Sequence, residues 1–169
     1  RAAAQLPVGE GSRWWFKLLT GQRQGEILGA TLADLDLDAG IYQVAWKLEE
    51  IPREHGCGGK CGHTRPAACP QARRRIPDGY DGHHLEGRYW LTRPKSNTGR
   101  LVPLVPQLVE ALRRHLELSA GLPNPYGLIW HKPDGSPIGK ANDGDAWRSL
   151  LLDAGVITEA ENHAGGTTL

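Results

Sequence analysis

The chain has 169 residues, with 20 Lys and Arg against 19 Asp and Glu, and 39% of its residues are hydrophobic. This length suits one domain with its own core, and the balanced charge and frequent Leu and Val argue against wholesale disorder. No run approaches the roughly 18 apolar residues of a membrane span. Because the formal net charge is only +1, a nucleic-acid partner has to be sought in local clusters of charge. The chain begins at Arg1 without a signal-peptide pattern, so we expect a piece of a longer protein.

The N-terminal segment predicts two helices separated by a short break. Ser12 is placed to cap the first helix and Gly21 to end it. A second, short helix is predicted over 24–28, directly after Arg23. The apolar positions that indicate the first helix are Trp14, Trp15, Leu18 and Leu19.

Strand patterns follow, and a long insertion interrupts them. After a turn at 38–40, residues 42–48 alternate between apolar and polar side chains, which is typical of one half-buried strand. Residues 51–88 lack periodicity and are rich in Gly and Pro, so we interpret them as a loop-rich Cys/His insertion within the domain. Residues 89–93 and 100–105 again have strand character, and they flank a predicted hairpin tip.

The C-terminal part predicts two more helices. Pro106 suits the first turn of one helix, whereas Asn142 and Gly155 are placed to cap and to end the next. Their apolar faces comprise Leu108, Val109, Leu112 and Leu116 in the first helix and Trp147, Leu150, Leu151 and Ala154 in the second. Residues 1–169 therefore predict the α+β class, a mainly helical domain with a small antiparallel β-sheet.

Arg23 is the first candidate for a functional side chain. It lies between the helix-ending Gly21 and a new helix start, so the backbone aims its guanidinium at a defined point, where Glu26 could hold it. An Arg fixed in this way suits bidentate recognition of a phosphate. The alternative is an ordinary interhelical salt bridge, which this segment alone favours.

A second candidate is the predicted hairpin tip, where Arg93, Lys95 and Arg100 surround a Ser, Asn, Thr and Gly turn. A cationic fingertip of this kind can enter a DNA groove. Its Lys could also donate a proton to a leaving oxygen. An edge hairpin kept soluble by its charges is the alternative.

Three stretches, in this order, resemble the catalytic domain of tyrosine recombinases of the phage-integrase type, and the resemblance covers most of the chain. TGQRQGEILGATLADLDLDAG is similar to the first arginine box of the family. LTRPKSNTGRLVPLVPQLVEALRRH is similar to its lysine hairpin and the following helix, and NDGDAWRSLLLDAGV to the helix before the His-x-x-Arg box. The insertion HGCGGKCGHTRPAACP is similar to one found in some actinobacterial and actinophage integrases.

The resemblance implies site-specific DNA recombination, in which a Tyr attacks a phosphodiester, forms a 3′-phosphotyrosyl bond and releases a 5′-hydroxyl without an obligatory metal. In that reaction Arg23 would bind the phosphate, Lys95 would protonate the leaving 5′-oxygen, and His163 would open the second box. Arg93, Lys95 and Arg100 would contact DNA. The resemblance also implies double-stranded DNA as partner, a homotetramer in synapsis, and action in the bacterial cytoplasm without a membrane.

The C-terminal stretch departs from the family pattern. Gly166 stands where the second box carries Arg, and no Tyr follows this box. The Tyr residues of the chain all precede it, at Tyr42, Tyr80, Tyr89 and Tyr126. We therefore expect that the chain is incomplete at its C-terminus and that this polypeptide alone does not recombine DNA.

The insertion offers five candidate metal ligands within fifteen residues. Cys57, Cys61 and Cys69, with His55 as the fourth ligand or His63 in its place, would form the Cys3His set that tetrahedral Zn²⁺ accepts. Such a zinc would be structural, because a segment with few apolar residues needs a staple and the inferred chemistry does not call for a metal. Three free thiols in a reducing compartment are the first alternative, and a disulfide that leaves one Cys unpaired is the second.

Three functions remain open at this point. The first is a tyrosine recombinase, and the second is a non-catalytic, zinc-stapled DNA-binding module on the same scaffold. The third is an interaction protein whose Arg and Lys form only surface salt bridges. The basic triplet at 73–75 could meet phosphates in the first two cases, although such triplets are usually solvated.

Overall fold

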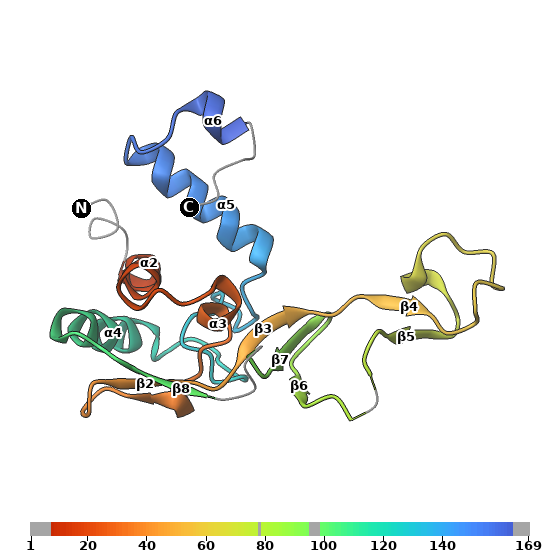
Figure 1. Ribbon diagram of the computed structural model, residues 1–169, viewed down its shortest axis with the longest axis horizontal. Coiled ribbons are helices and arrows are strands. Elements are labelled where there is room, and N and C mark those ends of the chain that lie inside the picture. Colours follow the sequence, from red (N-terminus) through yellow and green to blue (C-terminus); the bar gives the residue numbers. More distant parts are fainter. Residues whose placement is uncertain (1–7, 78, 95–98, 164–169) are drawn as a thin grey trace.

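The computed structural model describes residues 8–77, 79–94 and 99–163, in a helical body from which an arm of strands extends (Figure 1). In these ranges, no helix has the length and apolar character needed to cross a membrane. The helices are α2 (Val8–Thr20), α3 (Gln24–Leu28), α4 (Pro106–Ser119), α5 (Lys140–Asp153) and α6 (Glu159–His163).

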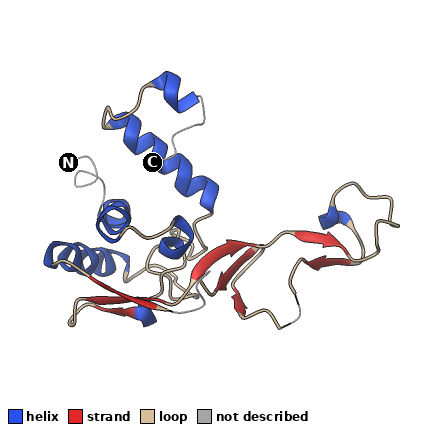
Figure 2. Ribbon diagram, in the orientation of Figure 1, coloured by secondary structure: helices blue, strands red, loops and turns tan. Residues whose placement is uncertain are grey.

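The strands form three small antiparallel sheets (Figure 2). The first, in the order β1-β2-β8, joins β1 (Leu35–Asp36), β2 (Ile41–Val44) and β8 (Arg100–Pro103). The second, in the order β3-β7-β6, joins β3 (Lys47–Glu50), β7 (Tyr89–Thr92) and β6 (Gly82–His84). The third pairs β4 (Arg53–His55) with β5 (Ala72–Arg74). The predicted α+β class, mainly helical with small antiparallel sheets, is confirmed.

The core of the body lies between α2, α4 and the first sheet. Phe16 packs edge-on against both Tyr42 and Trp130, with ring centroids 5.3 Å and 5.0 Å apart. Leu108 and Leu112 of α4 are fully buried against them, as the helical periodicity predicted. Helix α4 thus buries one apolar stripe, which is the usual source of helix stability in a globular domain. In α2, Trp14 and Phe16 are buried, whereas Leu18 and Leu19, which the spacing predicted on the apolar face, are 63% and 53% exposed.

The helix boundaries predicted from Gly and Pro are found in the structure, whereas the two predicted N-caps, Ser12 and Asn142, are wrong. Ser12 lies inside α2, where its hydroxyl accepts a hydrogen bond from Trp130 Nε1 at 3.0 Å. Asn142 lies inside α5, which begins at Lys140. The backbone N–H of Lys140 donates to the Glu50 carboxylate at 3.0 Å. A side chain 90 positions away thus satisfies the helix start, and no local pattern reveals such a cap.

The strand predicted over 42–48 is broken in two. The amide of Ala45 turns back to the Gln43 carbonyl at 3.0 Å, so β2 and β3 enter different sheets. The end of α3 rests on the second piece, because a Cβ on Gly29 would lie 2.5 Å from the Leu48 nitrogen. The strands that flank 95–99 likewise do not pair with each other: β7 pairs with β3 and β8 pairs with β2.

The insertion at 51–88 contains β4, β5, β6 and the 3₁₀ turn η2 (Pro66–Ala68). Its first part, residues 53–76 with β4, η2 and β5, forms what we call the outer arm. The outer arm lies away from the helices of the body in the view of Figure 1. Only Ile51 and Cys69 are buried among the described residues of the insertion. The missing apolar periodicity therefore reflects strands without a buried face rather than a segment without strands.

Candidate functional site

Arg23 sits in the break between α2 and α3. The left-handed backbone of Gly21, with a φ of +61°, ends the first helix. The extended backbone of Arg23 then caps the second helix, and its own N–H donates to the Glu26 carboxylate at 3.2 Å. The Arg23 guanidinium contacts the same carboxylate at 3.3 Å, yet its side chain is 75% exposed. The backbone of Arg23 is thus fixed while most of its side chain is exposed to solvent.

Glu26 joins Arg23 to a second arginine from a distant strand. Its side chain is only 2% exposed, and Arg100 of β8 approaches it with both terminal nitrogens, at 2.7 and 3.3 Å. Burial by itself would raise the pKa of Glu26, but the hydrogen bonds and charges of Arg100 and Arg23 outweigh it and lower that pKa. The same contact raises the pKa of Arg100. Glu26 is therefore a buried anion that holds two partly exposed guanidinium groups.

Arg23 also lines a cavity of about 350 Å³, and two lysines that no local sequence pattern indicates line it too. Lys47 of β3 and Lys140 of α5 both contact the Glu49 carboxylate, at 2.6 and 2.7 Å. Burial by itself would raise the pKa of Glu49, but the hydrogen bonds and charges of Lys140 and Lys47 outweigh burial and lower that pKa. The cavity carries three cations against two carboxylates, so it favours an anionic group such as a phosphodiester. Nothing local in the sequence connects these lysines to Arg23.

The other predicted site residues have different surroundings. Arg93 pairs with Asp81 at 3.0 Å, and its guanidinium carbon lies 4.0 Å from the centre of the Trp46 ring. Lys95 lies outside the described residues. His163 is the last residue of α6, and its side chain also lies outside the described part. Of the predicted phosphate and DNA contacts, the structure brings Arg23 and Arg100 together through Glu26.

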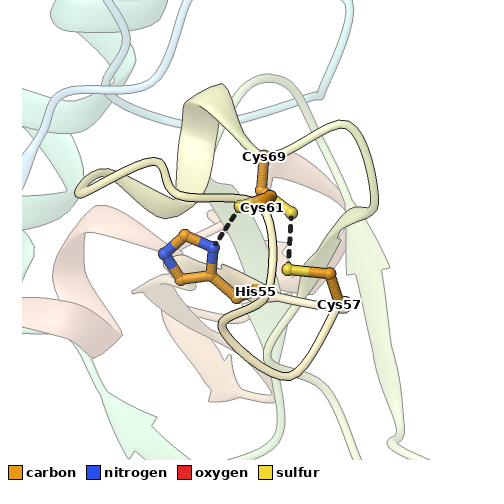
Figure 3. A group of neighbouring side chains, drawn as sticks. All are labelled: His55, Cys57, Cys61 and Cys69. Atoms are coloured by element: carbon orange, nitrogen blue, oxygen red, sulfur yellow. Dashed lines mark hydrogen bonds between the residues drawn. The ribbon is translucent and has the colours of Figure 1, made fainter.

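The metal-ligand candidates converge in the outer arm (Figure 3). His55, Cys57, Cys61 and Cys69 place their ligand atoms within 4.8 Å of one another. Cys61 Sγ lies 3.4 Å from His55 Nδ1, and the sulfurs of Cys69 and Cys57 are 3.5 Å apart. His63 is exposed and does not belong to this group.

The donor chemistry of this cluster fits a zinc ion. Three thiols and one imidazole form the Cys3His set, and sulfurs bound to one Zn²⁺ at about 2.3 Å lie at separations similar to those seen here. Desolvation would raise the pKa of Cys57, but hydrogen bonds from Cys61 and Cys69 outweigh it and lower the pKa to about 6. A thiol that ionises readily is prepared for a metal, because the thiolate is the ligand. This cluster could hold a metal ion, which is consistent with a structural zinc.

Comparison with known proteins agrees with the resemblance seen in the sequence. No family model matches the chain. An integrase from Saccharopolyspora erythraea is 28% identical over an alignment of 186 residues. This alignment covers 95% of this chain and 42% of that protein. The chain thus spans less than half of the length of this relative.

Two solved structures share the fold. The Tn1549 transposon integrase, in complex with transposon right-end DNA, superimposes with a TM-score of 0.57 at 18% identity, over 89% of this chain and 39% of that one. The XerA recombinase superimposes with a TM-score of 0.56 at 15% identity, over 92% of this chain and 40% of its own. The predicted fold is confirmed.

Proposed function

Because the integrase relative and the two structural neighbours support membership of the tyrosine recombinase and integrase family, we propose that this chain is part of a site-specific DNA recombinase. In this proposal it belongs to the catalytic domain of an enzyme that cleaves and rejoins double-stranded DNA through a 3′-phosphotyrosyl intermediate. The observation that carries the proposal is the Arg23 cavity with its excess of positive charge.

The chemistry needs donors for a phosphoryl group that gains charge in the transition state. The Tyr hydroxyl gives its proton to a base and bonds to phosphorus, the bond to the 5′-oxygen breaks, and an acid protonates that oxygen. Arg23 supplies hydrogen-bond donors to the phosphate, Lys95 is the acid, and His163 adds a group from the second box. Glu26 is a positioning residue in this scheme, because its carboxylate reaches Arg23 and Arg100 rather than the phosphate.

DNA contacts and assembly follow from the same proposal. Arg93 and Arg100 flank the segment that contains Lys95, and their side chains are 41% and 44% exposed. We place them against the phosphates on either side of the cleaved bond. The partner is double-stranded DNA in the bacterial cytoplasm, and synapsis of two duplexes would use four copies of the full-length protein.

The test compares cleavage with binding in the full-length protein. Arg23→Ala should slow formation of the covalent protein–DNA adduct on a nicked substrate by about 10²–10³-fold. Duplex affinity should fall only several-fold, because one phosphate contact is a small part of the footprint. Arg113→Ala is the matched control, because this exposed arginine of α4 pairs with Asp38 on another surface. An equal loss of binding and cleavage by Arg23→Ala would contradict the proposal.

Lys95 requires a separate experiment, because its role is proton transfer. Lys95→Ala should slow cleavage of an ordinary phosphodiester. A 5′-phosphorothiolate substrate should restore the rate, since a thiolate leaves without an acid. Absence of this rescue would remove Lys95 from the role of general acid.

A non-catalytic DNA-binding module stapled by zinc is the second candidate, and the cluster of Figure 3 favours it. The purified full-length protein should contain about one zinc ion per chain by elemental analysis. Cys69→Ser, at a buried ligand position, should lower the zinc content and increase proteolysis within 51–88. Zinc content that is the same in the variant would contradict the metal site. A metal-loaded protein that binds DNA but never forms a covalent adduct would favour the binding module over the recombinase.

A further inference from the structure

Positive charge is concentrated in one segment of a nearly neutral chain. Residues 53–76 contain six Lys and Arg and a single Glu, whereas the whole chain has a formal net charge of only +1. The remainder of the chain is therefore net negative. This segment is the outer arm, which contains β4, η2, β5 and the metal-ligand cluster.

Most of these cations have no acidic partner among the residues that the structure describes. Arg73 pairs with Glu54 at 2.8 Å, and Arg74 donates to the carbonyls of Ile51 and Gly87. The other four are exposed and have no ion pair with any of the described residues. They are Arg53, Lys60, Arg65 and Arg75.

The outer arm is ordered by polar contacts instead of a core. Arg74 ties β5 to the start of the arm and to the turn before β7. A Cβ on Gly56 would lie 2.2 Å from the Gln71 carbonyl, so the two strands approach closely at their far end. The loop between Cys57 and Cys69 carries Lys60 and Arg65, and the His55 cluster closes it. The cations are thus carried by an ordered segment, which lowers the entropy cost of binding.

The outer arm is also connected directly to the candidate site. Lys47 and Glu49 of β3 line the Arg23 cavity, and the chain leaves the body from the end of the same strand and enters β4 (Figure 1). A duplex whose phosphate occupies the cavity is therefore held close to the base of the arm. For the cations of the outer arm, the neighbouring phosphates of that duplex are then the nearest closely spaced negative charges.

We propose that the outer arm binds the phosphate backbone of the DNA duplex beside the cleaved site, through Arg53, Lys60, Arg65 and Arg75. The inference rests on the proposed function, since it assumes a duplex in the Arg23 cavity. DNA is favoured over a protein partner by the surface chemistry. Among the described residues of 53–76 no large hydrophobic side chain is exposed, whereas protein interfaces centre on buried apolar anchors.

The decisive variant removes three charges from the arm of the full-length protein: Arg53→Gln, Arg65→Gln and Arg75→Gln. Binding is measured against the recombination site with long flanks and against the same site trimmed to its core. Affinity for the flanked duplex should fall by on the order of 100-fold at 0.15 M salt, and the slope of log affinity against log salt should become shallower by between about 2 and 3. Affinity for the trimmed duplex should change much less.

The matched control removes three charges from the helices: Arg113→Gln, Arg114→Gln and Arg148→Gln. It should leave the advantage of the flanked duplex intact. An arm variant that behaves like this control, or a wild-type protein that binds both duplexes equally, would overturn the arm proposal while the proposed function stands. A wild-type protein that binds neither duplex would instead overturn the proposed function.

A second measurement does not depend on comparing affinities. A benzophenone amino acid in place of Arg65 should form a light-induced crosslink to the flank of the duplex. A crosslink only to a second protein copy, with none to DNA, would overturn the proposal in favour of a contact between copies. Thermal unfolding of each variant checks that the arm remains folded.

Discussion

Glu26→Gln tests whether one buried carboxylate organises the cationic site. The substitution keeps the size and one oxygen acceptor, but it removes the charge that accepts hydrogen bonds from Arg23 and from both terminal nitrogens of Arg100. Hydrogen bonds to charged groups contribute about 1.5–3 kcal/mol. The side chains of Arg23 and Arg100 are 75% and 44% exposed, so water compensates their charges in part, and we expect a loss near the lower end of that range.

The pH dependence distinguishes this mechanism from a simple packing defect. The pKa of Glu26 is lowered in the folded protein. Its contribution to stability is therefore complete above the unfolded-state pKa and is lost as the pH falls through the folded pKa. The difference in unfolding free energy between wild type and Glu26→Gln should be largest near pH 7. It should begin to shrink as the pH falls below the ordinary Glu pKa of about 4.3, and it should vanish once the pH has fallen through the lowered folded-state pKa, where the wild-type carboxyl is also neutral.

Urea unfolding at several pH values measures this difference. Glu54→Gln is the control, because the Glu54 carboxylate pairs with the exposed Arg73 on the arm, and exposed ion pairs contribute at most about 1 kcal/mol. A Glu26→Gln loss that stays constant from pH 7 to pH 3 would refute the electrostatic argument. A loss equal to that of Glu54→Gln at pH 7 would show that burial of Glu26 adds nothing.

Two further substitutions test the scaffold under the site. Gly29→Ala should destabilise the protein by about 1–3 kcal/mol, because its Cβ would lie 2.5 Å from the Leu48 backbone nitrogen. Gly144→Ala in α5 has room and should stabilise by about 0.5–1 kcal/mol, and equal effects in urea unfolding would contradict the close approach. Asp143→Asn should cost about 3–5 kcal/mol, because Arg13 pairs with Asp143 at 3.0 Å with both side chains more than nine-tenths buried. A loss below about 1 kcal/mol in thermal unfolding would show that this pair is not needed.

Features set by neighbouring residues could be predicted from the sequence. The start of α3 after Arg23 and the start of α4 at Pro106 depend on local backbone preferences, and both are found as predicted. The contact between Arg23 and Glu26 is also local, since residues three apart on a helix share one face. The ligand group around His55 could be found for the same reason, because its members lie within fifteen residues.

Features that depend on distant residues could not be predicted. The α5 start is satisfied by Glu50, and Glu26 is joined to Arg100 across 74 positions. The break between β2 and β3 has the same origin, because alternation of apolar residues continues through 42–48 although the two halves join different sheets. Period-two alternation reports which face is buried. It does not report which strand is the partner.

The position of the insertion explains how the fold accommodates an arm without a core. The ladder between β3 and β7 is complete before the arm begins, because Glu50 pairs with Tyr89 and the Ile51 amide donates to the Arg88 carbonyl at 2.8 Å. The ladder between β3 and β7 therefore needs no hydrogen bond from the arm. A segment attached in this way is free of the packing requirements of the body. Its sequence can consequently carry cations and metal ligands in place of apolar residues, and the near-zero net charge of the whole chain conceals this separation.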